Sequence, residues 1–447
     1  MRKLAVFLFS TLLVVGCSSS SDDFTGGGPE PTACSNDGQK QFVLDALYDW
    51  YLWNDLLPAN IDIADYASPE SLVLEVTTTF GPQDALGNPI DRWSSVGSLA
   101  ADQQYYGEGR YEGFGFSWRE EGGDMRMTGV FPGSPADNAG LARGQTVITL
   151  NNRTYADIVA NEGINTFFDN NATVEFAMRR LDNTTFSEPV TKDIVTITPI
   201  PQWRTINIGD GVPPVGYMEF RTFVSTADPV FDQVFADFIA AGVQDVIIDL
   251  RYNGGGLVRT AELLGDYLGG FANDGLVFSQ TEFNAERAAA NNSASFFSRR
   301  ANSLDITRFI VVASRSTASA SELVTNSLIP YADVWIVGDN TYGKPVGQVG
   351  FEFCEKILRP TSFRTTNANG DGDYFDGLPV DCAAADVLEV PVGADNDPNI
   401  VAAVSISQTG ACPVVAVPEF EQAPLMLPEV RYPDARGNTA RELAGAY

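Results

Sequence analysis

The sequence predicts an α/β fold that is preceded by a small helical region and a β-rich region. In residues 198–447, short apolar runs alternate with segments of helical spacing, as in sheets of parallel strands covered by helices. Alternating apolar residues and glycine-rich turns indicate strands in residues 108–197, and apolar residues at helical spacing indicate helices in residues 37–107. A chain of 447 residues, 44% of them hydrophobic, is long enough for several cores.

The first seventeen residues predict an export signal. A basic start at Arg2 and Lys3 precedes an apolar run, residues 4–15, which is shorter than the roughly 20 residues a membrane-spanning helix needs. The run closes on small residues before Cys17, which resembles the lipobox of bacterial lipoproteins and implies that Cys17 carries a lipid. Residues 18–36 predict a flexible tether. Because no aspartate follows Cys17 directly, we expect a lipid-anchored protein of the bacterial cell envelope, at the outer membrane and facing the periplasm or the cell surface.

Two segments of the helical region, residues 37–107, carry helix signals. Phe42, Leu47 and Tyr51 recur at helical spacing. Ser68 before Pro69 is a favourable start for a second helix, because serine caps the first free N–H groups and proline suits the first helical position. We expect the aromatic residues of this region to form a core.

The β-rich region contains two motifs that are more specific together than alone. One is the turn Gly113-Phe114-Gly115-Phe116, and the other is Ser134-Pro135-Ala136 followed by Ala139-Gly140-Leu141. Their succession resembles a PDZ domain, with expected bounds at residues 108–197. The resemblance implies that an adjacent strand edge pairs with a peptide, whose terminal carboxylate is bound by the backbone N–H groups of Gly113, Phe114, Gly115 and Phe116.

Polar motifs follow the apolar runs of the α/β region. The expected strands cover residues 215–220, 246–248, 309–312 and 334–337, and the expected helices cover residues 231–239, 261–268 and 323–328. Three of the strands lead into loops of polar and small residues, namely residues 249–256, 316–322 and 343–348, and the first and third of these contain glycine. In open α/β sheets, functional sites lie where strands end, so we expect the site in these loops.

Composition excludes several kinds of function. With 28 basic and 58 acidic residues the formal charge is −30, which argues against a nucleic acid partner because phosphate binding depends on Lys and Arg. The chain contains no histidine, so a Ser-His-Asp triad, a Cys-His pair and an HExxH zinc site are excluded. A hydrolytic site in this chain needs another base.

A serine and a lysine supply such a site. The Ser319 hydroxyl needs a base to become a nucleophile, and Lys344 can accept its proton only if burial lowers the lysine pKa from about 10.4 toward neutrality. The apolar strand at residues 334–337 can supply that burial, and Gln348 can orient the amine. An oxyanion hole needs free N–H groups beside the nucleophile, and the expected donors are Gly255, Gly256 and Ala320.

The three loops also carry a family resemblance. DLRxNxGG at residues 249–256, SxASASE at residues 316–322 and Gly-Lys before Gln348 are similar to motifs of the carboxyl-terminal processing proteases, the tail-specific serine peptidases of family S41. The resemblance implies a crotonase-like ββα core with Ser319 as nucleophile, Lys344 as base and Gln348 as a third catalytic residue. It implies a serine endopeptidase of the cell envelope that acts on proteins with accessible C-terminal tails and uses no metal or cofactor.

Other interpretations of the same residues exist. Ser319 and Glu322 also match a capping box, which would give both a structural role, although the accompanying loops favour catalysis. At the level of the protein, the alternatives are a catalytically silent envelope scaffold that binds tails, and a hydrolase of non-peptide substrates on the same core.

Four further cysteines predict two disulfides, because their number is even and the expected compartment is oxidising. A bond between Cys354 and Cys382 would close a local loop, and one between Cys34 and Cys412 would tie the two ends of the fold together. Four cysteines allow three pairings, and the sequence leaves the choice open.

Overall fold

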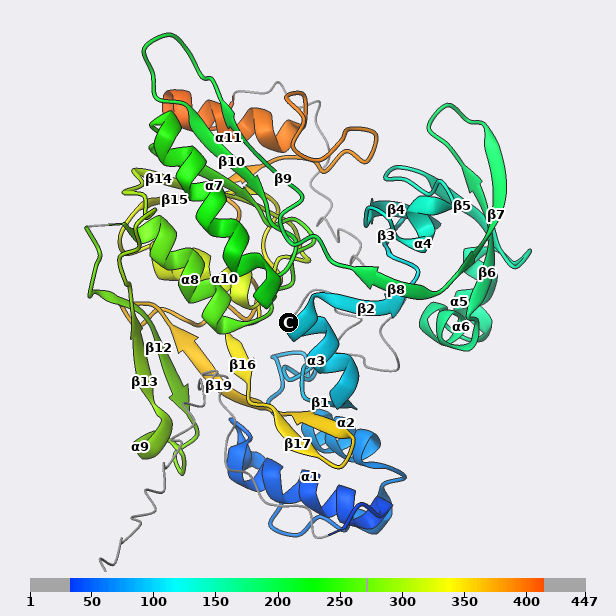
Figure 1. The fold of residues 1–447 in the computed structure, drawn as a ribbon. Helices are drawn as coiled ribbons and strands as arrows, with labels where there is room; N and C mark the ends of the chain where they lie inside the picture. Colours follow the sequence, from blue (N-terminus) through cyan, green and yellow to red (C-terminus); the bar gives the residue numbers. More distant parts are fainter. Residues whose placement is uncertain (1–32, 271, 414–447) are drawn as a thin grey trace, which may run out of the picture.

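A computed structural model describes residues 33–270 and 272–413. These residues form three parts, an N-terminal helical unit, a β-rich unit and an α/β core (Figure 1). The helical unit lies at one end of the core, and the β-rich unit lies to one side of both. Cys17, the expected lipidation site, lies outside the described residues. Within the described ranges, no helix combines the length and the apolar character that crossing a bilayer requires.

The N-terminal unit begins earlier than expected. Helix α1 starts directly after Ser35, whose side chain accepts from the Gly38 amide, so the last residues of the predicted tether at residues 18–36 are part of the fold. Helix α2 starts at the predicted cap Ser68, which confirms that helix start. The elements of the unit are α1 (Asn36–Trp50), α2 (Pro69–Phe80), β1 (Ser95–Ser98) and α3 (Leu99–Glu108).

This unit shares its hydrophobic core with the α/β core. Residues of α1 and α2 pack with Phe351 and Phe363, and the Phe42 and Phe353 rings stack with centroids 4.6 Å apart. Strand β1 pairs antiparallel with β18 (Lys356–Arg359), which in turn pairs with β17 (Phe351–Phe353). A disulfide between Cys34 and Cys354 adds a covalent link. Packing therefore joins the helical unit to the core despite their separation in sequence.

The β-rich unit has a core of its own, built around buried aromatic residues. Its sheet has the order β3-β4-β5-β6-β7 with antiparallel pairing, so β3 and β7 are edge strands. A separate ribbon of two strands, β2 and β8, connects the unit to the rest of the chain (Figure 1). The elements are β2 (Arg110–Gly113), β3 (Phe116–Glu121), β4 (Asp124–Val130), α4 (Pro135–Asn138), β5 (Thr146–Leu150), α5 (Tyr155–Asn161), α6 (Ile164–Asn170), β6 (Thr173–Arg179), β7 (Thr185–Thr191) and β8 (Asp193–Thr196).

The α/β core is built on a six-stranded sheet with the order β20-β15-β14-β11-β10-β9. Its strands are parallel except β9. Alternate residues point to opposite faces. Val246 and Ile248 of β11 pack with helices α7, α8 and α10, whereas Ile247 packs with α11 on the other face. The elements are β9 (Gln202–Ile206), β10 (Val215–Glu219), α7 (Asp228–Ala241), β11 (Asp245–Asp249), α8 (Val258–Gly269), β14 (Arg308–Ala313), α10 (Ala320–Leu328), β15 (Asp333–Gly338), β20 (Cys382–Ala383) and α11 (Pro398–Thr409).

A second sheet extends from the core beside the N-terminal unit, with the order β13-β12-β19-β16. It brings strand β16, which follows Lys344, next to β19. The other disulfide joins Cys382 to Cys412, so neither of the two example pairings considered from sequence occurs. The remaining elements are β12 (Val277–Phe283), α9 (Ala288–Asn291), β13 (Ser293–Phe296), β16 (Val346–Gln348) and β19 (Thr361–Thr366).

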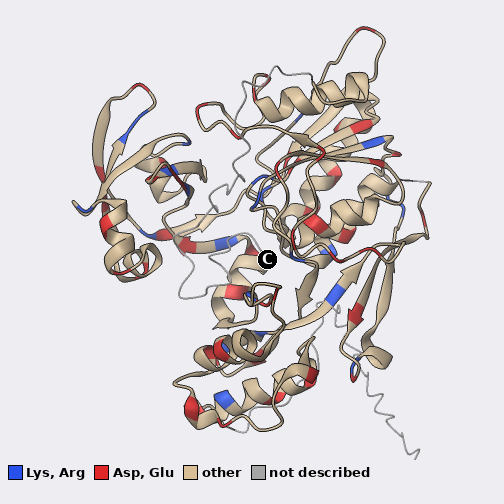
Figure 2. Cartoon of the chain, turned by 180° about the vertical axis from the view of Figure 1, so that it is seen from behind, with Lys and Arg blue, Asp and Glu red and all other residues tan. Residues whose placement is uncertain are grey.

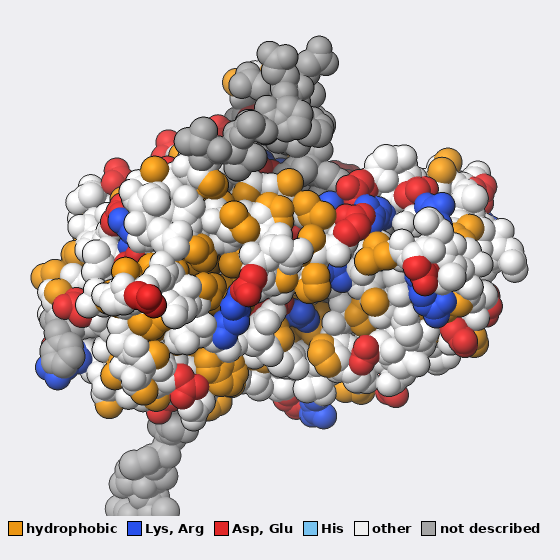
Figure 3. Space-filling model, turned by 90° about the horizontal axis from the view of Figure 1, so that it is seen from above, with side chains coloured by type: hydrophobic (Ala, Val, Ile, Leu, Met, Phe, Trp, Pro, Cys, Tyr) orange, Lys and Arg blue, Asp and Glu red, His pale blue; other side chains and the backbone are white. Residues whose placement is uncertain are grey.

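Acidic residues are distributed over all three parts of the chain (Figure 2). On the face shown in Figure 3, acidic and basic side chains lie beside one another in small groups, with no broad basic patch among the described residues.

Candidate active site

Ser319 occupies a sharp turn between β14 and α10. Its backbone has φ 54° and ψ −114°, a conformation that costs a non-glycine residue about 1–3 kcal/mol. Two hydrogen bonds fix the preceding residues, from Thr317 Oγ1 to the Leu250 carbonyl at 2.7 Å and from the Ala318 amide to the Asn253 carbonyl at 3.1 Å. The turn therefore places Ser319 at the N-terminus of α10, where free N–H groups favour developing negative charge.

The glycine-rich loop after β11 lies against this turn. A Cβ atom on Gly256 would lie 2.1 Å from the Phe223 carbonyl oxygen, so only glycine fits there. The Gly255 amide donates to Asn253 Oδ1 at 2.9 Å, so it is already engaged within the loop. We therefore remove Gly255 from the expected oxyanion donors, and Gly256 and Ala320 remain as the predicted donors.

Lys344 is buried, with 2% of its surface exposed. Burial lowers the pKa of its amine from 10.5 to about 7, an effect that Arg359 reinforces and that the carboxylates of Asp91 and Glu322 oppose. The ring that lies over the amine is that of Trp93, with its centroid 5.7 Å from Nζ. The strand at residues 334–337, expected to bury the lysine, packs into the cores on the two sides of the main sheet instead.

Gln348 contacts the lysine amine directly. Lys344 Nζ donates to Gln348 Oε1 at 3.1 Å. Gln348 Nε2 donates to the carbonyl oxygens of Trp93 at 2.6 Å and Arg359 at 3.0 Å, which fixes the orientation of the side-chain amide. The predicted contact between Gln348 and the amine is therefore present.

Glu322 joins the serine turn to the lysine loop. Its Oε2 accepts from the Ser319 amide at 2.9 Å and from the Lys344 amide at 2.8 Å. Its Oε1 accepts from the Gly343 amide at 2.7 Å and from the Thr341 hydroxyl. Burial raises the pKa of this carboxyl, and the four donors oppose that effect. One oxygen atom thus brings the backbones of Ser319 and Lys344 together.

Family comparison assigns two segments of the chain. Residues 214–381 match Peptidase family S41, and residues 38–95 match the Peptidase S41 N-terminal domain. Together these segments cover about half of the chain and include the serine turn, the glycine loop and the lysine loop. The chain belongs to peptidase family S41.

Curated relatives at low identity are named as C-terminal processing peptidases or proteases. The S41 chain is 26% identical over 282 residues to the chloroplastic C-terminal processing peptidase of Tetradesmus obliquus, covering 58% of this chain and 56% of the relative. It is 22% identical over 272 residues to the carboxy-terminal processing protease of Bacillus subtilis, covering 60% and 55%. The matches span about half the length of these relatives.

Solved structures share the fold of this S41 protein. A Bacteroides fragilis protein assigned to the S41 proteases superposes with a TM-score of 0.63 at 21% identity, covering 83% of this chain and 97% of that one. The photosystem II D1 C-terminal processing protease gives a TM-score of 0.53 at 19% identity, covering 84% and 99%. These likenesses and the observed layers confirm the predicted α/β protease fold with a small helical N-terminal region.

The predicted peptide-binding turn lies in the β-rich unit of the S41 chain, directly before edge strand β3. Phe114 and Phe116 are fully buried and pack against Phe168 and Phe176. A Cβ atom on Gly115, which has φ 86°, would lie 2.2 Å from Ser134 Cβ. The two phenylalanine side chains therefore support the core of the unit, and only the backbone of the turn remains for a ligand.

Sequence reasoning missed two contributors to this S41 site. Trp93 reaches Lys344 and Gln348 from the N-terminal unit, far away in sequence. Asp386, beyond the last motif, accepts from Arg251 of the DLRxNxGG loop at 3.1 Å and also contacts Tyr252 of that loop. Neither residue lies in a motif that the sequence singled out, and only the three-dimensional fold brings them to the site.

Proposed function

We propose that this S41 protein is a serine endopeptidase in which Ser319 is the nucleophile and Lys344 is the general base. The main support is the buried Lys344 amine, whose pKa of about 7 leaves much of it uncharged at neutral pH. The shared contacts of Glu322 with both backbones and the contact of Gln348 with the amine support the same pairing.

The proposed reaction has two halves. Ser319 Oγ attacks the carbonyl carbon of a peptide bond, and its proton passes to Lys344 Nζ. The resulting oxyanion accepts hydrogen bonds from the amides of Gly256 and Ala320. The C–N bond breaks as the lysine ammonium returns the proton to the leaving amine. Water then attacks the acyl ester, with Lys344 again accepting a proton and returning it to Ser319 Oγ as the acid product leaves.

We further propose that the β-rich unit binds the C-terminal tails of protein substrates in the manner of a PDZ domain. Strand β3 lies at the edge of its sheet, so an extended peptide can pair with its outer side. The backbone of Gly113–Phe116 directly precedes that edge and is the proposed carboxylate site.

The proposed cellular setting is the bacterial envelope, with the chain anchored by lipid on Cys17. The two disulfides of the described residues fit an oxidising compartment. Metabolic labelling with a fatty acid analogue tests the anchor, which we expect to label the wild-type chain and not Cys17→Ser. Equal labelling of both would contradict it.

The catalytic proposal is tested with the wild type, Ser319→Ala and Lys344→Ala acting on an unfolded protein that ends in an apolar tail. We expect the wild type to cleave and both folded variants to lose at least about a thousandfold in kcat/KM, because the nucleophile or its base is missing. The same substrate with an amidated C-terminus tests tail binding and should show a higher KM. Equal cleavage by all three proteins would exclude the Ser-Lys pair, and tail binding without cleavage would favour a scaffold.

A further inference from the structure

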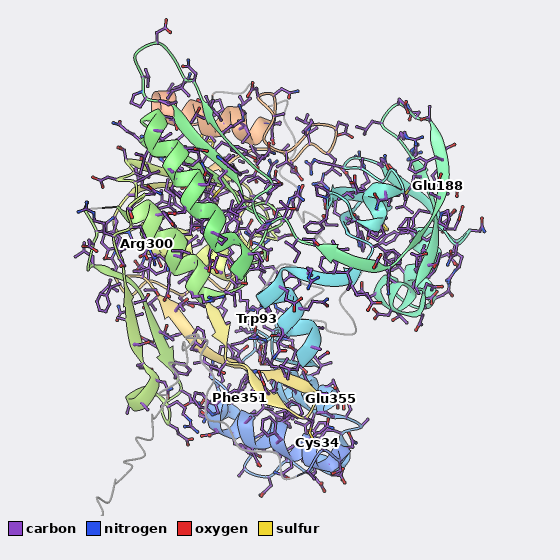
Figure 4. The ribbon with its side chains drawn as sticks, viewed as in Figure 1. Cys34, Trp93, Glu188, Arg300, Phe351 and Glu355 are labelled. Atoms are coloured by element: carbon purple, nitrogen blue, oxygen red, sulfur yellow. A yellow bond between two sulfur atoms is a disulfide. The ribbon has the colours of Figure 1, made fainter. Side chains whose placement is uncertain are left out.

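One turn of the N-terminal unit, residues 91–94, reaches into the proposed catalytic site. The Trp93 side chain is 1% exposed and packs against Ala318, beside the nucleophile, and against Val346, close to the base. Its ring centroid lies 5.7 Å from Lys344 Nζ, and its carbonyl oxygen accepts from Gln348 Nε2 at 2.6 Å. Figure 4 shows Trp93 where the N-terminal unit meets the core.

Asp91 fixes the shape of this turn. Its side chain is buried, and Oδ1 accepts from the Trp93 amide at 3.0 Å and from the Ser94 amide at 3.2 Å. The same oxygen accepts from Thr361 Oγ1 of β19 at 2.9 Å, and Oδ2 accepts from the Ser94 hydroxyl at 2.6 Å. Since β19 pairs with β16, which carries Gln348, Asp91 locks the turn to the strand pair beside the lysine.

We propose that Trp93 and Asp91 are positioning residues of the catalytic site, so that the N-terminal unit supplies part of the setting in which Lys344 works as a base. The proposal rests on the proposed Ser-Lys function. Trp93 shields the amine from water and holds Gln348, which in turn holds the amine. Asp91 holds Trp93 in place and contributes a negative charge near the amine.

Trp93 and Asp91 shift the pKa of Lys344 in opposite directions. The charged groups that face Lys344 are Asp91 from the turn, Glu322 from α10 and Arg359 from β18, and Arg359 is itself paired with Asp102 at 2.8 Å. Exclusion of water by Trp93 disfavours the charged amine and outweighs the attraction of its ring face 5.7 Å away, because burial is the largest influence on this lysine. The Asp91 carboxylate favours the charged amine. General damage to the site would move the lysine pKa in the same direction in variants of Trp93 and of Asp91. Opposite shifts in the two variants would therefore distinguish the proposed roles from damage.

The test compares Trp93→Leu and Asp91→Asn with the wild type. Asparagine can keep the hydrogen bonds of Asp91, because Oδ1 still accepts and Nδ2 can donate to the Ser94 hydroxyl, so this variant removes mainly a charge. The matched controls are Trp50→Leu, a buried tryptophan of the same unit that packs against Phe351, and Asp45→Asn, on the exposed side of α1.

Two readouts are needed. The first is the pH dependence of acetylation of Lys344 in a Ser319→Ala background, followed by mass spectrometry, which reports the pKa of the amine without any catalysis. The second is the pH dependence of kcat/KM. We expect the Lys344 pKa to rise in Trp93→Leu and to fall in Asp91→Asn. At pH 6, kcat/KM should fall in Trp93→Leu by roughly tenfold if the lysine pKa rises by one, and should rise in Asp91→Asn by roughly fivefold if it falls by one. Both controls should follow the wild type.

Identical acetylation profiles in Trp93→Leu, Asp91→Asn and the wild type would overturn the proposal, as would a lysine pKa that moves in the same direction in both variants. If Trp93→Leu fails to fold, Asp91→Asn alone decides, and a lowered lysine pKa supports the proposal. If the wild type cleaves no protein, the proposed protease function fails, while the acetylation profiles still decide whether the turn positions the lysine.

Discussion

At the scale of single residues, two unfavourable features meet in one place. Ser319 has a positive φ that costs a non-glycine residue stability, and Lys344 holds a basic amine away from water. Residues that reduce stability persist mainly where they serve a function. Their contact through Glu322 therefore indicates an active site even apart from the sequence motifs.

The cost of burying Lys344 predicts that Lys344→Met stabilises the protein. Because the amine has a pKa of about 7 in the folded state and 10.5 when unfolded, the cost is complete below pH 7 and declines as the pH rises toward 10.5. We expect a gain in the free energy of unfolding on the order of 5 kcal/mol at pH 6, and a smaller gain at pH 9. Urea unfolding at the two pH values measures both.

The control for this variant is Lys356→Met, which removes a partly exposed lysine paired with Glu70. Such pairs contribute little, so it should show no gain at either pH. A Lys344→Met protein that is less stable than the wild type at pH 6 would show that burial of the amine is not costly and would remove the main argument for a neutral lysine.

At the scale of elements, the start of α10 holds the site together. Glu322 receives four donors from two segments, the serine turn and the loop between β15 and β16. Helix α10 itself is fully buried, so the carboxylate cannot exchange these donors for water. The capping box expected from sequence is therefore also the link between nucleophile and base.

Glu322→Gln tests that link. A glutamine carries one oxygen and one N–H₂ group, so the group that replaces one carboxylate oxygen faces two donors and cannot accept from them. We expect a loss of about 2–3 kcal/mol in the free energy of unfolding and at least about a hundredfold in kcat/KM. Thermal unfolding and the cleavage assay measure these effects. Glu282→Gln, on the exposed side of β12 and paired with Arg364, is the control and should change neither.

Sequence patterns predict the central elements of the core well. The strands expected at residues 215–220, 246–248, 309–312 and 334–337 correspond to β10, β11, β14 and β15, because buried parallel strands are continuous apolar runs. The short strands β16 to β19 were missed, since residues 343–366 mix polar and apolar residues without a clear period. The placement of Trp93 was missed as well, because it depends on the pairing of β1 with β18, two strands that lie far apart in the sequence.

At the scale of the whole molecule, the two disulfides close loops of very different length. Cys34 and Cys354 are separated by 320 residues, and Cys382 and Cys412 by 30. In the chain-entropy model, the disulfide that closes the longer loop stabilises the folded protein by about 2 kcal/mol more than the other disulfide. We expect Cys34→Ser with Cys354→Ser to lower the Tm more than Cys382→Ser with Cys412→Ser. Calorimetry of the two double variants measures this, and the reverse order would contradict the chain-entropy account.

The β-rich unit is attached to the core by an ionic network centred on Asp386. Arg119 of β3 donates to Asp386 Oδ2 at 2.9 Å, and Arg143 donates to Oδ1 at 2.6 Å. Arg251 of the glycine loop donates to the same Oδ1 at 3.1 Å. Burial alone would raise the pKa of this carboxyl, but the surrounding arginines hold it below its usual value. Asp386 therefore connects the proposed tail-binding edge with the loop that carries Gly256, a proposed oxyanion donor.

Replacing this carboxylate should loosen the β-rich unit while leaving the core folded. In Asp386→Ala, Arg251 keeps its ion pairs with Asp249 and Asp397. Arg143, in contrast, loses its only ion-pair partner among the described residues. Because a buried charge without its partner is costly, we expect a larger radius of gyration in X-ray scattering, faster proteolysis within residues 110–196, and a several-fold higher KM for tailed substrates. Glu389→Ala removes an exposed ion pair with Arg126 in the same segment and should change none of these. If the two variants behave alike, position 386 does not hold the unit, and packing of the β2–β8 ribbon must orient it instead.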